Sequence, residues 1–230
     1  MIRVAILGAS GFVGSELLRL CAQHPLLRPT KLFGSSRAGQ RLDAVHPHLA
    51  LAYPEAAVNS YAPAALDEDV DLVFAALPHG QSQSVALDVI GRGIPFVDLG
   101  ADFRLDSADD YSLWYREPHR APDLLDRFVY GIPELNRGAI AGSATVAAAG
   151  CYATAAILAL KPLMALVEPG SVVVDAASGV SGAGKAAKEE SHFNSVDENF
   201  SAYGLLAHRH TAEMEMALGG KVLFTPHLAP

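Results

Sequence analysis

Residues 2–14 read IRVAILGASGFVG, and this stretch decides the fold that the sequence predicts. Ile2 to Leu7 are mostly apolar, as a short buried strand requires, and glycines follow at 8, 11 and 14 before helix-forming residues run from Ser15 to Gln23. A strand, a glycine turn and a helix in this order predict a dinucleotide-binding unit. The glycines permit a tight bend and close approach to a diphosphate, and the phosphate lies on the helix N-terminus. The candidate contacts from this turn are Gly8, Ser10, Gly11, Phe12, Val13 and Gly14.

The end of the second predicted strand, residues 30–34, indicates which dinucleotide fits. An NAD site usually has Asp or Glu about 20 residues beyond the glycines, where the carboxylate binds the ribose 2′-hydroxyl. This chain has Ser35, Ser36 and Arg37 in that region. Two hydroxyls and a guanidinium suit a 2′-phosphate, so NADP(H) is the predicted cofactor. The alternative for Arg37 is a solvated loop residue.

Strands and helices alternate through the rest of the first 148 residues. Apolar runs at 70–77, 94–99 and 145–148 predict strands, and residues 82–92 predict a helix. This repeated βαβ order implies an α/β fold with a doubly wound parallel sheet. Pro78 stands at the carboxyl end of a predicted strand, the edge where such sheets bind ligands, and is a further cofactor candidate.

Residues 38–69 are less regular and predict mostly loop, with one strand and one short helix. The segment His46-Pro47-His48 has the look of a metal-binding pair. No cysteine or paired carboxylate stands at ligand spacing, so a turn is predicted instead, and no metal site.

Cys151 precedes a strongly helical run from Ala155 to Leu166, and Gly150 marks the break before it. A cysteine at a helix N-terminus is favoured as a thiolate, because unpaired N–H groups and the positive end of the helix dipole stabilise its charge. Cys151 is therefore a candidate nucleophile; the alternative is a small apolar residue that fills the core. Cys21 falls on an apolar helix face and is predicted to be buried.

A second glycine-rich loop follows the strand predicted at 171–176. Residues 179–185 fit the phosphate-loop pattern G-x-x-x-x-G-K, but Ala186 stands where a Mg²⁺-binding hydroxyl belongs. A nucleotide-hydrolysing site is therefore disfavoured. We expect this loop to hold a phosphoryl group or the cofactor through backbone N–H groups. Its candidate residues are Ser178, Ser181, Gly182 and Lys185.

The segment Ala207-His208-Arg209-His210 opens a helix predicted to reach about Leu218, and a strand begins at 222–225. Imidazoles titrate near neutral pH, so His208 or His210 is a candidate proton carrier beside a thiolate. Arg104 and the motif 130–136, which includes Glu134, follow predicted strand ends where substrate is expected.

Composition narrows the classes of partner. The 230 residues carry 25 acidic and 17 basic side chains, a formal charge of -8, which argues against nucleic acid as a partner. No apolar run approaches the roughly 18 residues that would cross a bilayer. With two cysteines and no signal-peptide cleavage region at its start, the chain is expected in the reducing cytoplasm.

Taken together, these motifs resemble the N-acetyl-gamma-glutamyl-phosphate reductase family, which is related to the aspartate-semialdehyde dehydrogenases. The resemblance rests on the glycine turn, residues 77–80, 102–105, 130–134, 150–154, 178–184 and 208–211. It implies an NADP-binding Rossmann domain at 1–148 and an α+β catalytic and dimerisation domain at 149–230 that stops short of the family's C-terminus.

The resemblance also implies a reaction and its residues. The family reduces N-acetyl-gamma-glutamyl phosphate with NADPH, in arginine biosynthesis, through a cysteine thioester and as a homo-oligomer. Carried over to this chain, the nucleophile is Cys151 and the acid/base is His208, with His210 as the alternative. Arg104, Glu134 and Lys185 are the substrate-binding candidates. Ala149 departs from the family, which usually has proline before the Gly-Cys pair.

Other functions remain open from the sequence. The same chemistry could serve N-acetyl-aminoadipyl or aspartyl phosphate, since pocket shape decides between them. Different classes are a phosphate-loop NTPase and a non-catalytic NADP-binding regulator.

Overall fold

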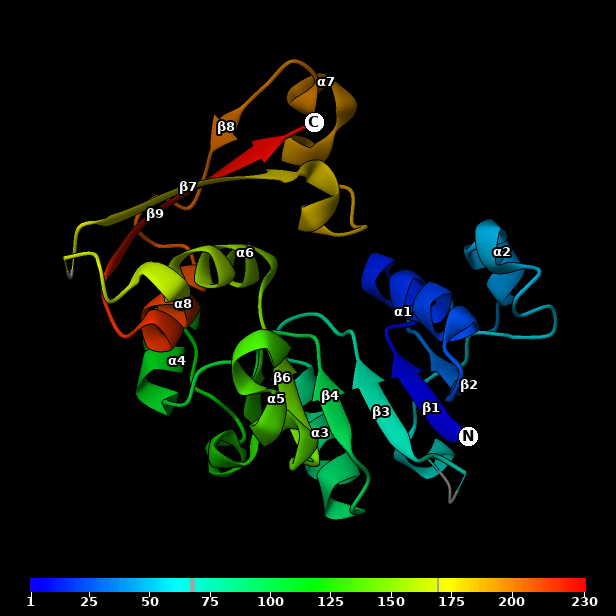
Figure 1. The fold of residues 1–230 in the computed structure, drawn as a ribbon. Coiled ribbons are helices and arrows are strands. Elements are labelled where there is room, and N and C mark those ends of the chain that lie inside the picture. Colours follow the sequence, from blue (N-terminus) through cyan, green and yellow to red (C-terminus); the bar gives the residue numbers. More distant parts are fainter. Residues whose placement is uncertain (67–68, 169) are drawn as a thin grey trace. The chain divides into compact units, whose positions relative to one another are not determined.

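The computed structural model describes residues 1–66, 69–168 and 170–230, and they form two compact units (Figure 1). The first unit comprises residues 1–103, 126–131 and 136–148, and the second comprises 104–125, 132–135 and 149–230. The second unit therefore takes two segments from the part of the chain that precedes residue 149.

The first unit is built on a six-stranded parallel sheet with the order β2-β1-β3-β4-β6-β5. Its strands are β1 Ile2–Leu7, β2 Leu27–Phe33, β3 Leu72–Ala75, β4 Phe96–Asp98, β5 Val129–Gly131 and β6 Thr145–Ala148. The chain runs from β1 outward to β2 and then returns to the other side of β1 as β3. This reversal makes the carboxyl end of β1 a topological switch point, where doubly wound sheets bind ligands.

The helices of the first unit connect its parallel strands. They are α1 Phe12–Gln23, α2 Leu42–Val45, α3 Ser82–Gly91 and, across the division between the units, α5 Pro133–Ala141. The division falls at Asn136, whose φ of -119° breaks the helical geometry of α5. A buried cluster joins β1 and α1 to the segment after β2, through Ile6, Leu18, Leu42 and Val58 among others.

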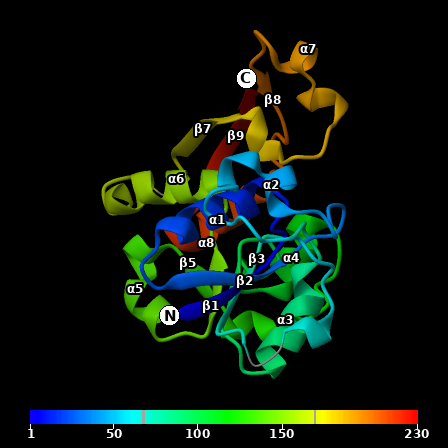
Figure 2. The same cartoon turned by 90° about the vertical axis from the view of Figure 1, so that its right-hand side faces the viewer.

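The second unit has a small mixed sheet with the order β7-β9-β8. Strands β7 Val172–Gly179 and β9 Val222–Ala229 are parallel, and β8 Ser201–Ala202 pairs with β9 in the antiparallel sense. The helices are α4 Ala108–Tyr115, α6 Cys151–Leu160, α7 Phe193–Val196 and α8 His210–Leu218. Figures 1 and 2 show α6 and α8 side by side along this sheet.

The predicted α/β class and parallel sheet are confirmed, but several boundaries are wrong. Helix α1 begins at Phe12 rather than Ser15, and α8 begins at His210. Helix α6 starts at Cys151 and ends at Leu160, not Leu166. The cause is Pro162, which has no N–H to continue the helical ladder, so residues 161–163 tighten into a 3-10 turn.

The strand expected within residues 38–69 does not form among the described residues of that range, which exclude 67 and 68. Arg41 and Asn59 take part only in isolated bridges, with Ala57 and Phe33. The short helix expected there is α2, and Cys21 is buried as predicted. None of the described helices combines the length and apolarity that a membrane crossing needs.

The close packing at the glycine turn predicts that alanine substitution destabilises the protein at Gly14 but not at Gly91. A Cβ at Gly14 would lie 2.3 Å from the Gly8 carbonyl oxygen, whereas one at Gly91 meets nothing within 4 Å. We expect Gly14→Ala to lower the free energy of unfolding by about 1–3 kcal/mol through overpacking against rigid backbone. Gly91→Ala should leave it unchanged or raise it by up to ~1 kcal/mol. Urea unfolding followed by circular dichroism measures both; equal midpoints for the two variants would contradict the close packing at Gly14.

Candidate functional site

The glycine turn of the first unit lies between the ends of β2 and β3. The N–H groups of Gly8 and Ala9 both donate to the Phe33 carbonyl oxygen, at 2.9 and 2.8 Å. Gly8 has φ +82°, and a Cβ on it would lie 2.1 Å from the Ala76 carbonyl oxygen. Only glycine fits this position. Its positive φ is unfavourable for residues that have a Cβ, and a Cβ would also collide with the backbone that follows β3.

The same edge of the sheet carries the other residues predicted to bind the cofactor. A Cβ on Gly34 would lie 2.8 Å from Ser10 Oγ, so the turns after β1 and β2 touch. Ser35, Ser36 and Arg37 follow Gly34 and are exposed. Helix α1 begins after Gly11, an N-cap residue that provides no side-chain hydrogen bond to the helix. An open helix N-terminus beside close backbone turns and an exposed guanidinium fits a dinucleotide with a 2′-phosphate.

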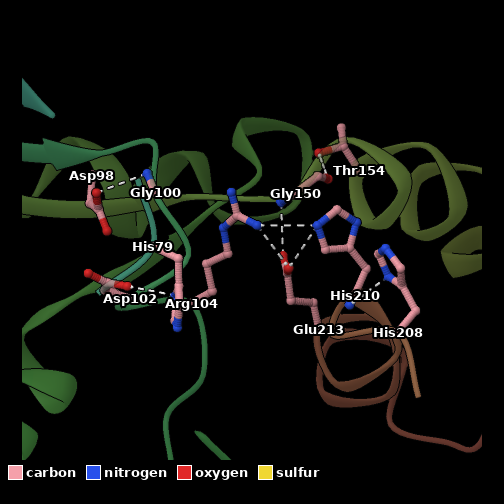
Figure 3. A network of polar contacts seen from close by, with 10 residues as sticks. All are labelled: His79, Asp98, Gly100, Asp102, Arg104, Gly150, Thr154, His208, His210 and Glu213. Atoms are coloured by element: carbon pink, nitrogen blue, oxygen red, sulfur yellow. Dashed lines mark hydrogen bonds and ion pairs between the residues drawn. The ribbon is translucent and has the colours of Figure 1, made fainter. Parts of the chain in front are cut away.

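Two buried aspartates organise the turns that follow β3 and β4 (Figure 3). Asp102 accepts hydrogen bonds from the N–H groups of Gly80 and Ser82, at 2.7 and 2.9 Å, and its Oδ1 lies 3.0 Å from His79 Nδ1. Asp98 accepts from Ser82 Oγ and from the N–H of Gly100. These contacts fix the turn that contains Pro78 and the start of α3.

Asp102 is ionised in this setting. Burial by itself raises the pKa of its carboxyl, but hydrogen bonds from His79 and from the two backbone N–H groups outweigh burial and hold the pKa below its ordinary value. The sequence predicted no binding or catalytic role for Asp102, which was interpreted as a cap. The only sequence signal for such a role is its position after the strand predicted at 94–99.

In the second unit, Cys151 is the first residue of α6 and its side chain is exposed. Gly150 caps the helix in an extended conformation. The N–H and Oγ1 of Thr154 both donate to the Gly150 carbonyl oxygen, at 2.8 and 2.9 Å. The motif Gly-Cys-x-x-Thr thus fixes the turn that presents the thiol at the helix N-terminus.

A buried carboxylate holds this turn from the opposite side (Figure 3). Glu213 of α8 is 0% exposed. Its Oε2 accepts from the Gly150 N–H at 2.9 Å, and its Oε1 accepts from Arg104 Nη1 at 3.1 Å. His210 Nε2 lies 3.5 Å from the same Arg104 nitrogen and 3.8 Å from Glu213 Oε1.

Gly150 leaves room for these neighbours. A Cβ there would lie 2.5 Å from His210 Nε2 and 2.7 Å from Arg104 Nη1. The imidazole and the guanidinium therefore pack directly on the backbone that precedes Cys151. The sequence predicted no role for Glu213. Its only sequence signal is its position one helical turn after the candidate histidine His210.

His210 is neutral at neutral pH. Burial, followed by the charges of Arg104 and Arg209, lowers its pKa to about 3. Its Nδ1 is buried and has no hydrogen-bond partner among the described residues. Since a guanidinium only donates, Nε2 is the acceptor towards Arg104, and the ring proton is assigned to Nδ1.

His208 has a different environment. Burial, then the neighbouring His210 and Arg209, lowers its pKa to about 4, although Glu213 opposes the shift. Its Nδ1 accepts from the His210 N–H at 3.2 Å. Its ring packs edge-on against Tyr152, Tyr203 and Phe224.

Tyr203, one of the aromatic residues packed around His208, is hydrogen-bonded to another of them. Its hydroxyl donates to that of Tyr152 at 3.3 Å, and the Tyr152 hydroxyl donates to the His227 carbonyl oxygen. Burial, the bond to Tyr152 and the nearby Cys151 all raise the pKa of Tyr203.

The remaining predicted residues are spread over both units. Glu134 is exposed on the first turn of α5, within the second unit. Ser178 ends β7 and lies against Gly182, where a Cβ would come within 2.4 Å of its Oγ. Ser181 and Gly182 lie in the 3-10 turn after β7, and Lys185 is exposed just beyond it. Cofactor candidates thus occur in the first unit and in this loop of the second. No group of three or more potential metal ligands exists in the described part of the chain.

Two family models match the chain. Residues 3–143 match the model described as semialdehyde dehydrogenase, NAD binding domain, and residues 151–230 match semialdehyde dehydrogenase, dimerisation domain. Solved structures share the fold: aspartate semialdehyde dehydrogenase II from Vibrio cholerae has a TM-score of 0.71 at 18% identity, over 100% of this chain and 70% of that one. The Candida albicans enzyme with NADP has a TM-score of 0.69 at 15% identity, over 100% and 68%.

Curated relatives are much closer in sequence. N-acetyl-gamma-glutamyl-phosphate reductase of Desulforudis audaxviator is 47% identical over 100% of this chain and 68% of its own length. The enzyme of the same name from Ectopseudomonas mendocina is 43% identical over 100% and 69%. The chain thus spans about two thirds of the length of these relatives, with the cysteine, glycine and histidine motifs inside the shared part. It belongs to the N-acetyl-gamma-glutamyl-phosphate reductase family, within the semialdehyde dehydrogenases.

Proposed function

We propose that this chain carries the catalytic machinery that reduces N-acetyl-gamma-glutamyl phosphate to N-acetyl-glutamate semialdehyde and phosphate with NADPH, a step of arginine biosynthesis. The observation that carries the proposal is the exposed Cys151 at the start of α6, on a turn held by buried Glu213 and packed against His210. A non-catalytic NADP-binding regulator has no use for this arrangement.

Cys151 acts as the nucleophile. Its thiolate sulfur forms a bond to the acyl carbon, and the bond from that carbon to the phosphate oxygen breaks, so phosphate leaves with the electron pair and a thioester remains. The N-terminus of α6 stabilises the thiolate before attack. NADPH, when bound, supplies the hydride that reduces the thioester carbon.

The geometry favours His210 over His208 as the proton carrier. His210 Nε2 lies against Gly150, the residue before Cys151, whereas His208 Nδ1 is bonded to backbone and its ring packs among aromatic side chains. Neutral His210 accepts the thiol proton at Nε2. The imidazolium formed in this step then returns the proton, to the oxygen of the thiohemiacetal. Collapse of that adduct transfers the hydroxyl proton back to His210 and breaks the carbon–sulfur bond. Cys151 leaves with the electron pair as a thiolate, and the aldehyde is released.

Glu213 and Arg104 position these groups. Glu213 holds the Gly150 N–H and so fixes where the thiol emerges. Arg104, a buried cation of the second unit, and the exposed Lys185 are our candidates for the anionic groups of the substrate. Glu134 of the predicted set remains a substrate-binding candidate. The loop from Ser178 to Gly182 remains a candidate for the phosphoryl group or the cofactor.

We also infer a small-molecule substrate, a homo-oligomer formed through the part that matches the dimerisation domain, and a cytoplasmic location.

The related acyl phosphates share this chemistry and are tested by substituting them in the assay. Ala186 in place of a hydroxyl residue disfavours a Mg²⁺-dependent NTPase.

Replacing the nucleophile should abolish turnover. We expect Cys151→Ser to reduce phosphate-dependent NADP⁺ reduction by N-acetyl-glutamate semialdehyde by at least about 10³-fold, because a serine hydroxyl is not ionised at this helix end. Cys21→Ala, which changes the buried cysteine, should keep the activity. Iodoacetamide labelling followed by mass spectrometry gives a second readout: the exposed Cys151 should be labelled, and the buried Cys21 should not. A Cys151 that does not react would contradict its assignment as the nucleophile.

The neutral state of His210 predicts how stability depends on pH. An unfolded histidine binds a proton below its ordinary pKa near 6.5, whereas folded His210 does so only near pH 3, so acid favours the unfolded chain between these values. When the pH falls from 7 to 5, the free energy of unfolding should decrease in the parent. In His210→Gln this decrease should be smaller by about 1–2 kcal/mol. The exposed His192→Gln is the control and should follow the parent. Parallel curves for all three proteins would mean that His210 is not held neutral.

Arg37 should determine the choice of dinucleotide. In Arg37→Glu, a charged hydrogen bond to the 2′-phosphate is replaced by repulsion. We expect the dissociation constant for NADPH to rise about 10–100-fold and the affinity for NADH to stay unchanged. Arg137→Ala, at an exposed arginine of α5, should bind both as the parent does. Fluorescence titration measures the constants of the parent and both variants for each dinucleotide, and an equal loss for NADH and NADPH in Arg37→Glu would contradict 2′-phosphate recognition.

A further inference from the structure

His46 and His48 bond to the glycine turn and to the start of α1. His46 Nε2 lies 2.9 Å from the Ala9 carbonyl oxygen, and His48 Nε2 lies 3.0 Å from Ser15 Oγ. The two rings meet edge to face, with centroids 5.9 Å apart. Figures 1 and 2 show α2, which immediately precedes His46, beside α1.

Apolar side chains anchor the segment that carries these histidines. Leu42 and Leu49, on either side of His46, belong to the same buried cluster as Ala9 and Leu18. His46 is 4% exposed, so its ring is enclosed by that packing. An imidazole buried this deeply is costly unless it is hydrogen-bonded, and the partner here is the backbone of the turn.

The bond from His46 sets the direction of a peptide group inside the turn. A carbonyl oxygen only accepts, so His46 Nε2 carries the proton and donates to Ala9. The peptide between Ala9 and Ser10 is trans, and in a trans peptide the C=O and the following N–H point in opposite directions. With the Ala9 carbonyl directed at His46, the Ser10 N–H is directed away from it.

We propose that His46 is a positioning residue for the cofactor: by holding the Ala9 carbonyl it orients the Ser10 N–H towards the diphosphate of NADP(H), and His48 braces the start of α1 through Ser15. The proposal rests on the dinucleotide binding proposed above. A flipped Ala9–Ser10 peptide would present a carbonyl oxygen to the phosphates in place of a donor, and this repels an anion. It also accounts for the His-Pro-His segment without a metal.

The test compares two variants of His46. His46→Leu keeps an apolar volume but has no donor, and His46→Gln keeps an N–H donor. In the 230-residue chain we expect His46→Leu to raise the dissociation constant for NADPH about tenfold, as the loss of one phosphate hydrogen bond would. His46→Gln should recover much of that loss. NADPH fluorescence titration measures each constant.

Tyr53→Phe is the matched control for a merely structural effect. Tyr53 comes from the same segment and donates its hydroxyl to the Leu18 carbonyl oxygen of α1 at 2.8 Å, away from the turn. Both Tyr53→Phe and His46→Leu remove one buried tether and should lower the melting temperature. Only His46→Leu should weaken NADPH binding.

A fragment of the cofactor sharpens the assignment. Adenosine 2′-monophosphate has the 2′-phosphate but no diphosphate, so its affinity as a competitor should change less than twofold in His46→Leu. Equal weakening of this fragment, or equal NADPH affinity in His46→Leu and the parent, would overturn the role of His46 and leave the proposed function intact. A parent chain that binds no NADPH would overturn both.

Discussion

The second unit depends on one buried carboxylate. Glu213 is fully enclosed, and its two oxygens accept from the Gly150 N–H and from Arg104. Either partner alone would leave part of a buried charge unpaired, at a cost of several kcal/mol. Arg104 and Gly150 come from segments 109 and 63 residues away in the sequence, so the bonds to Glu213 bring three parts of the chain to one point. The orientation of the Cys151 turn follows from this arrangement.

The first unit uses the same physical solution at different turns. Sheet strands and helix starts leave backbone N–H and C=O groups without partners, and these groups must be satisfied where water does not reach. Asp102 accepts two N–H groups at the start of α3, and His46 donates to a carbonyl of the glycine turn. Buried polar side chains thus fix the conformation of the turns at the carboxyl edge of the sheet, the edge where ligands bind in this fold.

The two histidines show how burial changes an acid–base group. An exposed imidazole would be partly charged near neutral pH, but enclosure beside Arg104 and Arg209 makes the charged form of His210 costly. Enclosure among aromatic rings has the same effect on His208. Both rings are therefore neutral in the resting protein, which is the state that a proton acceptor next to a thiol requires. The difference between them lies in position, since only His210 packs on the backbone before Cys151.

Local sequence patterns predicted the elements that depend on neighbouring residues: the strand, glycine turn and helix at the start, the alternation that gives a parallel sheet, and Cys151 at a helix N-terminus. They placed the ends of helices poorly, since a single residue such as Pro162 decides them, and they predicted a strand in residues 38–69 that finds no partner strand in the described part of that range. The contacts of Glu213, Asp102 and His46 could not be predicted in this way, because they form between distant parts of the folded chain. Their partners lie 20 to 109 residues away in the sequence, and a hydrogen bond over such a separation has no local pattern, because its two groups meet only after the chain has folded.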